Sequence, residues 1–203
     1  MPDRPAPSLT LLNFHGDALR PHLDALGQLR ISVFREYPYL YDGNLEYERD
    51  YLQCYLNSPR SLVVLAFDGE EVVGATTCLP MSDEGPEFQA PFLAAGIPVE
   101  SICYFGESIL LPQYRGLGIG KAFFERREAH SQSLPGMEMT TFCAVDRPVD
   151  HPRRPVDYRP LDSFWTKSGY TKRPELRCEF RWKEIDESEE TPKTLTFWVK
   201  QWA

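Results

Sequence analysis

The chain has 203 residues, of which 42% are hydrophobic and 26% are charged. That length suits one domain with a substantial core and is short for two, so we expect a single domain over residues 1–203. The formal net charge of −8 argues against non-specific binding to nucleic acid and favours a cationic partner. No apolar run approaches the roughly 20 residues of a membrane-spanning helix, and residues 1–10 lack the apolar segment of a secretory signal. We therefore expect neither a nucleic-acid partner nor a membrane partner.

The cysteines are scattered and odd in number, and none of them belongs to a C-x-x-C pair. The histidines do not supply the spacing of a zinc site either, so we expect no metal centre. This pattern indicates reduced, mostly buried thiols in a cytoplasmic protein. The cysteines are Cys54, Cys78, Cys103, Cys143 and Cys178.

Periodicity predicts a strand, two helices and a hairpin in the first part of the chain. Alternating residues indicate the strand, and apolar residues at helical spacing indicate the two helices. Asp68-Gly69 stands between two strand-like runs and is a strong hairpin signal. The predicted elements are a strand at 8–16, helices at 19–37 and 45–56, and strands at 61–67 and 71–79.

The second part of the chain alternates regular elements with two irregular segments. A polar, proline-marked insertion at 83–98 has room for one short helix, and the loop at 146–160 contains too many prolines for regular structure. A short helix at 161–170 ends at Gly169, a natural C-cap. The remaining predicted elements are strands at 101–111 and 137–145, a long helix between them, and closing strands at 175–185 and 193–202.

Three glycines, Gly116, Gly118 and Gly120, stand where the long helix should begin. The first N–H groups of a helix have no partner within it, and residues without side chains let an anion reach them. The glycines therefore indicate a phosphate site, with a tight turn and close packing as the alternative. The segment is not a Walker A loop, because Ala122 follows Lys121, and it is not a G-x-G-x-x-G fingerprint.

The segment Gln113–Gly118 (QYRGLG) resembles the acyl-CoA-binding motif of the GNAT superfamily of N-acetyltransferases. That motif has Arg or Gln, a Gly three residues later, and a Gly or Ala two residues after that. The segment also lies where the family has it, between the fourth strand and the third helix. The resemblance implies an α/β fold of the GNAT (acyl-CoA N-acyltransferase) type, with a mixed, mostly antiparallel central sheet flanked by helices. It also implies acetyl-CoA as the co-substrate.

The resemblance places cofactor contacts on the glycine turn, for pyrophosphate, and on the end of the preceding strand, whose edge would pair with pantetheine. Trp165 stands where the family commonly has a tyrosine that protonates the departing thiolate, and an indole N–H cannot serve as that acid. Trp165 therefore either lines the acyl-CoA cleft or packs in the core. The implied cofactor-binding residues are Ile109, Leu110, Leu111, Arg115, Gly116, Leu117, Gly118, Ile119, Gly120, Lys121 and Trp165.

An alkylamine is mostly protonated at neutral pH, so an N-acetyltransferase needs a group that accepts a proton from it. Glu107 is the first candidate, because it interrupts an apolar strand just before the glycine turn and the family often has an acid on this strand. The alternative for Glu107 is an edge-strand carboxylate turned to solvent. Tyr158 is the candidate general acid, with a surface tyrosine as the alternative. The fallback candidates for the base are Asp146, His151 and Asp157.

The junction between the first two helices contains Tyr37, Tyr39 and Tyr41, and in the family this junction borders the acceptor site. The alternative is an aromatic cap on the core. The proline loop is basic, and its arginines either hold a substrate carboxylate or cofactor phosphate or stand solvated. These arginines are Arg147, Arg153, Arg154 and Arg159.

Together these features predict an N-acetyltransferase that transfers an acetyl group from acetyl-CoA to the primary amine of a small molecule by direct attack. One alternative is a non-catalytic acyl-CoA-binding or sensing module, because Trp165 stands where the family commonly has its proton-donating tyrosine. Another is a protein lysine or N-terminal acetyltransferase, and a proline loop over the cleft would block its polypeptide. A homodimer is the oligomer that we consider for this chain.

Overall fold

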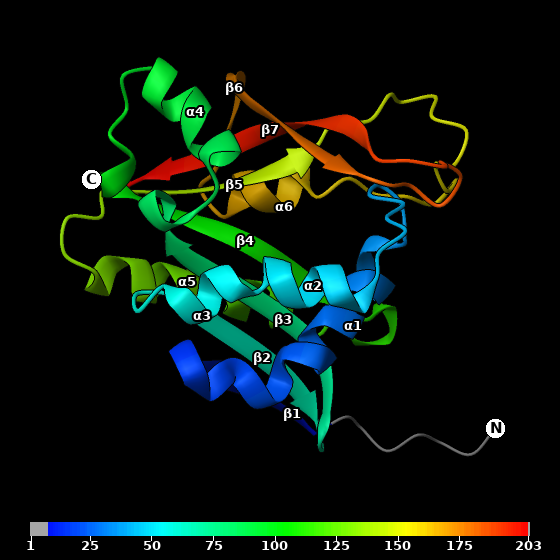
Figure 1. Ribbon diagram of the computed structural model, residues 1–203, viewed down its shortest axis with the longest axis horizontal. Helices are drawn as coiled ribbons and strands as arrows, with labels where there is room; N and C mark the ends of the chain where they lie inside the picture. Colours follow the sequence, from blue (N-terminus) through cyan, green and yellow to red (C-terminus); the bar gives the residue numbers. More distant parts are fainter. Residues whose placement is uncertain (1–7, 203) are drawn as a thin grey trace.

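Seven strands form one sheet in the order β1-β2-β3-β4-β5-β7-β6 in the computed structural model, which describes residues 8–202 (Figure 1). Only β4 and β5 are parallel, and every other neighbouring pair is antiparallel. The predicted mixed, mostly antiparallel sheet is therefore confirmed. The strands are β1 (Leu9–Phe14), β2 (Leu62–Asp68), β3 (Glu71–Pro80), β4 (Ile102–Leu110), β5 (Met139–Val145), β6 (Thr171–Trp182) and β7 (Thr191–Gln201).

Helices cover both faces of this sheet. Two buried hydrophobic clusters lie on opposite faces, one under the early helices and one under the late helices. On the first face lie α1 (Leu23–Phe34), α2 (Leu45–Tyr51), α3 (Gln53–Asn57) and the insertion helix α4 (Pro86–Ala94); on the second lie α5 (Ile119–Ser133) and α6 (Asp162–Lys167) (Figure 1). Short 3₁₀ turns are η1 (Gly16–His22), η2 (Met81–Asp83), η3 (Val99–Ser101) and η4 (Pro112–Tyr114).

Both of the early helices predicted from periodicity are interrupted. The predicted helix at 19–37 is a 3₁₀ turn up to His22 and an α-helix only from Leu23, because Pro21 lacks the N–H that an α-helix would use there. The helix predicted at 45–56 divides at Leu52, whose ψ of −7° is far from the α-helical value. The predictions of two uninterrupted helices were wrong, although the apolar faces are in the predicted places.

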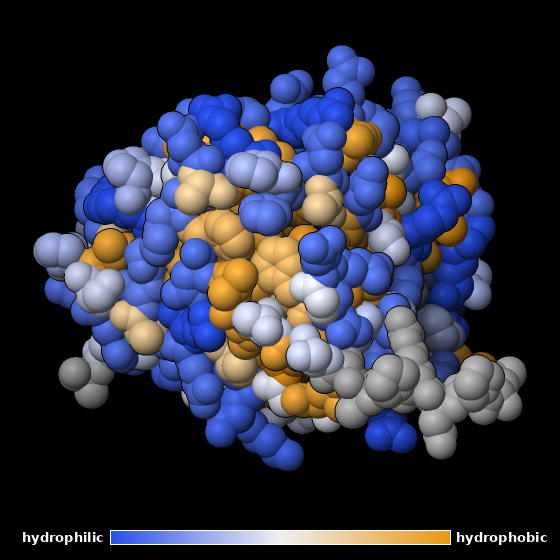
Figure 2. Space-filling model, turned by 90° about the horizontal axis from the view of Figure 1, so that it is seen from below, coloured by the Kyte–Doolittle hydropathy of each residue, from blue (hydrophilic) through white to orange (hydrophobic). Residues whose placement is uncertain are grey.

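At the lower edge of the molecule, β1 and η1 are exposed to solvent. Figure 2 views this side, where apolar side chains gather in the middle of the face and hydrophilic ones surround them. Leu12 of β1 is 46% exposed. None of the helices within residues 8–202 combines the length and the apolar character needed to span a bilayer.

The centre of the sheet divides between β4 and β5. In the described part of the chain, the two strands pair over only three positions, ending where Tyr104 lies opposite Thr141. Beyond that point β4 stays paired with β3, and β5 stays paired with β7. The sheet therefore opens toward the C-terminal end of β4, which is where the glycine turn follows.

The first stability prediction concerns the insertion helix α4. Phe92 is fully buried, and its ring meets the ring of Phe197 on β7 edge-on with centroids 4.9 Å apart. We expect Phe92→Ala to lower the free energy of unfolding by about 3–5 kcal/mol, because it removes a large buried ring and leaves a cavity. Leu93→Ala is the matched control: Leu93 is the next residue and is 55% exposed, so its truncation should cost less than about 0.5 kcal/mol. Urea unfolding measures both, and equal losses would contradict the packing described for α4.

Candidate active site

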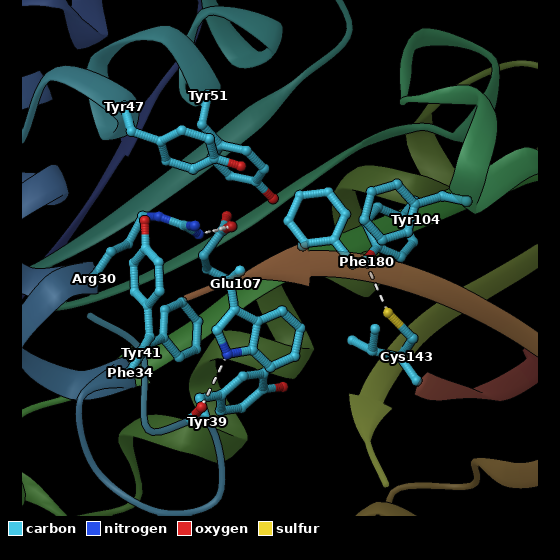
Figure 3. Close-up of a pocket in the computed structure, with 14 residues that line it drawn as sticks. Arg30, Phe34, Tyr39, Tyr41, Tyr47, Tyr51, Tyr104, Glu107, Cys143 and Phe180 are labelled. Atoms are coloured by element: carbon cyan, nitrogen blue, oxygen red, sulfur yellow. Dashed lines mark hydrogen bonds and ion pairs between the residues drawn. The ribbon is translucent and has the colours of Figure 1, made fainter. Parts of the chain in front are cut away.

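A cavity of about 90 Å³ opens on the α1 side of the divided sheet. One water needs roughly 10–15 Å³, so the cavity can hold several waters or a small organic group. Its walls come from α1, α2, the junction between them, α4, β4, β5, β6 and β7, and most of the side chains are aromatic (Figure 3). Its charged lining side chains are Arg30 and Glu107, which meet near the centre of the view in Figure 3.

A β-bulge turns Glu107 into this cavity. The pairing of β3 with β4 shifts between Thr76 and Cys78, which lie opposite Ser108 and Phe105, so β4 contains one extra residue there. Phe105 belongs to the cluster on the α5 face, and strict alternation would send Glu107 to that same face. The extra residue reverses the alternation and aims Glu107 toward α1. Gly106 is needed at the bulge, because an added Cβ would overlap the Tyr55 hydroxyl and lie 2.7 Å from Thr77 Oγ1.

Glu107 is 3% exposed, and its carboxylate is held by donors from three other elements. Arg30 of α1 donates through Nη1 to Oε1. Tyr55 of α3 and Thr77 of β3 donate their hydroxyls to Oε2, at 2.8 and 2.6 Å. The alternative of a carboxylate turned to solvent is therefore wrong for Glu107. Its role as the base remains a prediction.

Arg30 bridges Glu107 to a second buried acid. Its Nε donates to Glu48 of α2, which is fully buried. Burial alone lowers the pKa of Arg30, but the charges of Glu107 and Glu48 outweigh this effect and raise it well above its usual value. The guanidinium also lies 4.1 Å from the ring centroid of Tyr51 and 5.1 Å from that of Phe34. Two acids against one arginine leave this buried triad with a formal charge of −1 when all three groups are ionised.

Glu84, in the segment before α4, is a third acid close to the cavity. Burial raises its pKa to about 7, partly opposed by the hydrogen bond from the Gly85 N–H and aided by the charge of Glu107. Its Oε1 is buried and has no hydrogen-bond partner among residues 8–202. A carboxyl with this pKa changes protonation near neutral pH, which is the range in which a general base works best.

Tyr104 places a hydroxyl at the point where β4 and β5 part. Its Oη lies 3.2 Å from Cys143 Sγ on β5, across the opening (Figure 3). Burial raises the pKa of Tyr104 well above its usual value, so the hydroxyl stays protonated at neutral pH and can donate a hydrogen bond, but it is a weaker acid than an exposed tyrosine. The structure thus offers a hydroxyl inside the cavity, in addition to the predicted Tyr158.

Tyr158 lies in the proline loop, outside the cavity lining, and is half-buried. Its ring meets Tyr37 edge-on at 4.7 Å, and the Arg154 guanidinium lies 5.1 Å from its centroid. Trp165 lies on the other face of the sheet, where its ring contacts Phe142 and Trp198 at 5.1 Å. Trp165 thus packs against the core of the α5 face, and because it is only partly buried and lies on the same face as the glycine turn, lining the acyl-CoA cleft stays a prediction.

One side of the cavity is bordered by three loops that bind one another. Asp42, in the junction between α1 and α2, donates its N–H to the carbonyl of Lys183 at 2.8 Å, and Ile185 returns a bond to Leu40 O at 2.9 Å. Trp182 Nε1 donates to Tyr39 O at 3.0 Å. The junction and the turn between β6 and β7 are therefore joined by backbone as well as side-chain bonds.

Arg147 ties the proline loop to the same two segments. It donates to Pro38 O at 2.6 Å, to Tyr39 O at 3.1 Å and to Glu184 at 2.6 Å, and its side chain is 11% exposed. The solvated alternative is wrong for Arg147, because its side chain joins the proline loop to the α1–α2 junction and to the β6–β7 turn. Arg153 is 42% exposed and pairs with Asp186 of the β6–β7 turn.

The glycine turn lies on the other face of the sheet, at the C-terminal end of β4. Gly116 and Gly118 have φ values of +82° and +84°, and Gly118 is the N-cap of α5. A Cβ built on either glycine meets no atom within 4 Å, so the space in front of the turn is open. A Cβ on Gly120 would lie 3.6 Å from Phe164, which shows that α6 packs beside the start of α5. The Lys121 side chain is 80% exposed, and Arg115 pairs with Glu36 at 2.9 Å.

The free edge of β4 leads from this turn to the cavity. Leu111 N–H donates to Val73 O at 3.0 Å, so Leu111 and Ile109 direct their N–H groups toward β3. Leu110 therefore directs its N–H and C=O toward the opening, where Arg115 Nε donates to the carbonyl at 3.1 Å. Of the three residues predicted at this edge, Leu110 is the one whose backbone faces the open side.

Sequence reasoning missed most of the residues that surround Glu107. Arg30 offered a signal, because it continues the apolar helical stripe of Leu26 and Phe34 at a spacing of four residues. Tyr55 and Thr77 offered none, since a tyrosine on a helix and a threonine in a strand are ordinary. The predicted junction tyrosines Tyr39 and Tyr41 do line the cavity.

The profile of the acetyltransferase (GNAT) family matches residues 27–156. This match spans more than half of the chain, so the protein belongs to the acetyltransferase (GNAT) family and is an enzyme of the acyltransferase class. Both the predicted family and the predicted fold are confirmed. No curated protein matches the sequence at a significant level.

Several solved structures share the fold. An acetyltransferase from Thermus thermophilus is 18% identical with a TM-score of 0.57, over 96% of this chain and 97% of that chain. NAA60 from Arabidopsis thaliana in complex with acetyl-CoA is 13% identical with a TM-score of 0.61, over 96% of this chain and 98% of that chain. A ribosomal-protein-alanine N-acetyltransferase from Brucella melitensis is 13% identical with a TM-score of 0.60, over 94% and 99%. At these identities the likeness establishes the fold.

The raised pKa of Glu84 generates a prediction about stability and pH. Because the folded protein binds this proton more tightly than the unfolded chain, ionising Glu84 destabilises the fold progressively as pH rises from about 4.5 to about 7. Glu84→Gln has no charge to bury, so we expect it to exceed the wild type in stability by about 3 kcal/mol near pH 8 and to match it near pH 4.

Urea unfolding at the two pH values measures this difference. Glu100→Gln, at an exposed position, is the control and should differ from the wild type by a similar small amount at both pH values. If the difference in the free energy of unfolding between Glu84→Gln and the wild type does not change with pH, the Glu84 carboxyl is not buried in the way that its surroundings indicate.

Proposed function

We propose that the protein transfers an acetyl group from acetyl-CoA to the primary amine of a small molecule by direct attack. The observation that supports this most strongly is the position of Glu107. A buried acid stands in a cavity on one face of the divided sheet, and an anion-accepting turn lies on the other face. β4 runs from the cavity to this turn and is no longer paired with β5 beyond Tyr104, so we place the meeting of acyl donor and amine along this part of β4.

The glycine turn fits the phosphates of acetyl-CoA. The left-handed φ values of Gly116 and Gly118 and the open space before them leave the first N–H groups of α5 accessible to phosphate oxygens. Lys121 is exposed in the first turn of that helix and adds positive charge. Leu110 offers a strand edge for the amide groups of pantetheine, as the resemblance implies. When bound, acetyl-CoA supplies a thioester carbon that an amine can attack.

The chemistry requires a proton acceptor for the amine and a proton donor for the leaving thiolate. Glu107 lines the cavity and is the first candidate for accepting the proton, directly or through water. On the donor side, Tyr158 remains the candidate in the proline loop, and Tyr104 offers a hydroxyl at the opening that can donate a hydrogen bond to the leaving sulfur. The amine lone pair forms the new C–N bond as the C–S bond breaks.

The loops beside the cavity support a small molecule over a polypeptide as the acceptor. The junction, the β6–β7 turn and the proline loop are bonded to one another through Asp42, Trp182 and Arg147. Loops held together in this way leave less room for an extended peptide than separate loops would. One of the solved structures named above is a ribosomal-protein-alanine N-acetyltransferase, so a peptide acceptor is the second candidate and is included in the experiments below.

Cofactor binding is tested at the glycine turn with a matched pair of variants. Gly118 and Gly136 have similar backbones, with φ values of +84° and +79°, and an added Cβ meets no atom within 4 Å at either position. Glutamate therefore introduces the same strain and charge at both. We expect Gly118→Glu to lower acetyl-CoA affinity at least about 100-fold, because the side chain fills the phosphate seat, whereas Gly136→Glu leaves it unchanged. Calorimetric titration decides, and equal affinities would refute the cofactor site.

Catalysis is tested at Glu107. Glu107→Gln keeps the shape and removes the charge, so we expect kcat/KM to fall by about 10²–10⁴ while acetyl-CoA affinity survives. The rate of the variant should recover as pH rises toward the pKa of the amine, because solution then supplies the neutral nucleophile. The variant also breaks a buried ion pair, so its folding is checked by thermal unfolding.

Glu128→Gln serves as the comparison for this variant, because Glu128 is also a glutamate in an ion pair, with Lys200 at 2.8 Å, and does not line the cavity. We expect it to have near wild-type kinetics. Parallel pH–rate profiles for Glu107→Gln and the wild type, separated by less than about threefold, would exclude Glu107 as the base.

A further inference from the structure

The cavity around Glu107 is walled by aromatic rings that contact one another. From the junction inward, Phe34 and Tyr39 have centroids 4.7 Å apart, and Tyr39 and Trp182 have centroids 6.0 Å apart. Trp182 continues to Phe180 at 6.5 Å. Phe88 of α4 then contacts Phe180 at 5.5 Å and Tyr104 at 5.2 Å. These six rings form a nearly continuous wall from the acceptor side of the cavity to the opening in the sheet (Figure 3).

The charged groups of the cavity, Arg30 and Glu107, lie together. Arg30 lies against the rings of Tyr51 and Phe34 and is bonded to both Glu48 and Glu107, so its charge is compensated within the triad. With all three groups ionised, the triad has a formal charge of −1, which favours a ligand that brings an amine to Glu107. A ligand bound here therefore meets a charged group and a wall of aromatic rings.

A second hollow lies next to the cavity, on the side of the α1–α2 junction and the β6–β7 turn. It shares Tyr41, Tyr47 and Trp182 with the cavity, so these rings stand between the two spaces. Its outer rim contains Asp42, Glu189 and Glu190 as well as Arg181 and Lys183. Three acids against two bases make the rim mildly anionic, which suits the entry of a protonated amine.

We propose that the acceptor is a small arylalkylamine, a flat aromatic ring joined by a short chain to a primary amine. This inference rests on the proposed acetyl transfer. The ring packs among Phe34, Tyr39, Phe88, Tyr104, Phe180 and Trp182, and the amine reaches Glu107. Aromatic rings attract one another edge-on or offset beyond the effect of buried area, so an aromatic body is preferred over a saturated ring of equal size by several-fold to about tenfold.

Thiol release with acetyl-CoA is measured for four acceptors: 2-phenylethylamine, 2-cyclohexylethylamine, ethanolamine and an unblocked peptide that contains lysine. We expect kcat/KM for 2-phenylethylamine to exceed that for ethanolamine by at least about 100-fold and that for 2-cyclohexylethylamine by several-fold. Equal rates with the saturated ring would overturn the aromatic preference. A faster reaction with the peptide would assign the cavity to a polypeptide instead.

Paired truncations test whether the wall of the cavity causes this preference. Phe180→Ala should reduce kcat/KM for 2-phenylethylamine at least about tenfold and change that for ethanolamine less than about twofold. Phe14→Ala is the matched control, because Phe14 is also a partly buried phenylalanine but packs against His22 and Phe67 on the β1 side. It should leave both values unchanged. If Phe180→Ala unfolds, Phe180→Leu keeps the bulk and removes the ring, and should give the same pattern to a smaller degree.

Binding without acetyl-CoA separates this inference from the proposed activity. Calorimetric titration of 2-phenylethylamine into the protein should give binding that weakens at least about tenfold in Phe180→Ala and is unchanged in Phe14→Ala. Such binding without turnover of any amine would refute acetyl transfer and leave the ligand class standing. Turnover of other amines without binding of 2-phenylethylamine would refute the arylalkylamine as the ligand and leave acetyl transfer standing.

Discussion

The burial of Glu107 constrains the arrangement of much of the protein. An ionised carboxylate inside a protein is costly unless donors and an opposite charge surround it. Here those groups come from α1, α3 and β3, as Arg30, Tyr55 and Thr77, and Glu48 of α2 is drawn in through Arg30. None of these elements can move far from β4 without leaving a charge uncompensated. The ion pair thus specifies how the first helices sit on the sheet, although its net contribution to stability is small when the cost of burial is counted.

The bulge in β4 allows one strand to serve both faces of the sheet. Within the bulge, the backbone carbonyl of Glu107 accepts a hydrogen bond from the Thr76 hydroxyl at 2.8 Å and another from Arg127 of α5 at 3.3 Å. Arg127 is almost fully buried, lies over the rings of Phe105 and Phe124, and has a pKa lowered by burial. It joins the helix that follows the glycine turn to the backbone that carries Glu107. The side of the sheet that would hold phosphate and the side that holds the acid are therefore linked through a single peptide group.

Three loops border one side of the cavity and are bonded to one another. Backbone bonds join the α1–α2 junction to the β6–β7 turn, and Arg147 joins the proline loop to both. The aromatic rings that line the cavity come from the α1–α2 junction, from α1 and α2, from β4 and β6, and from the insertion that supplies Phe88. Under the proposed function, these segments select the acceptor, because a fold by itself does not specify one.

The sequence by itself determined the order of the strands and helices, the family and the turn, because alternation, helical spacing and the glycine pattern are local properties of the chain. It also pointed to Glu107, since a lone acid in an apolar strand is visible without a structure. The tertiary structure alone decided which way Glu107 faces, because a one-residue bulge reverses the side of a strand, and a single glycine such as Gly106 does not show by itself that the register shifts. It also decided that Arg30, Glu48, Tyr55 and Thr77 meet there, and that Trp165 packs on the opposite face. Contacts between residues far apart in the chain depend on how the elements pack, and periodicity within one element carries no information about them.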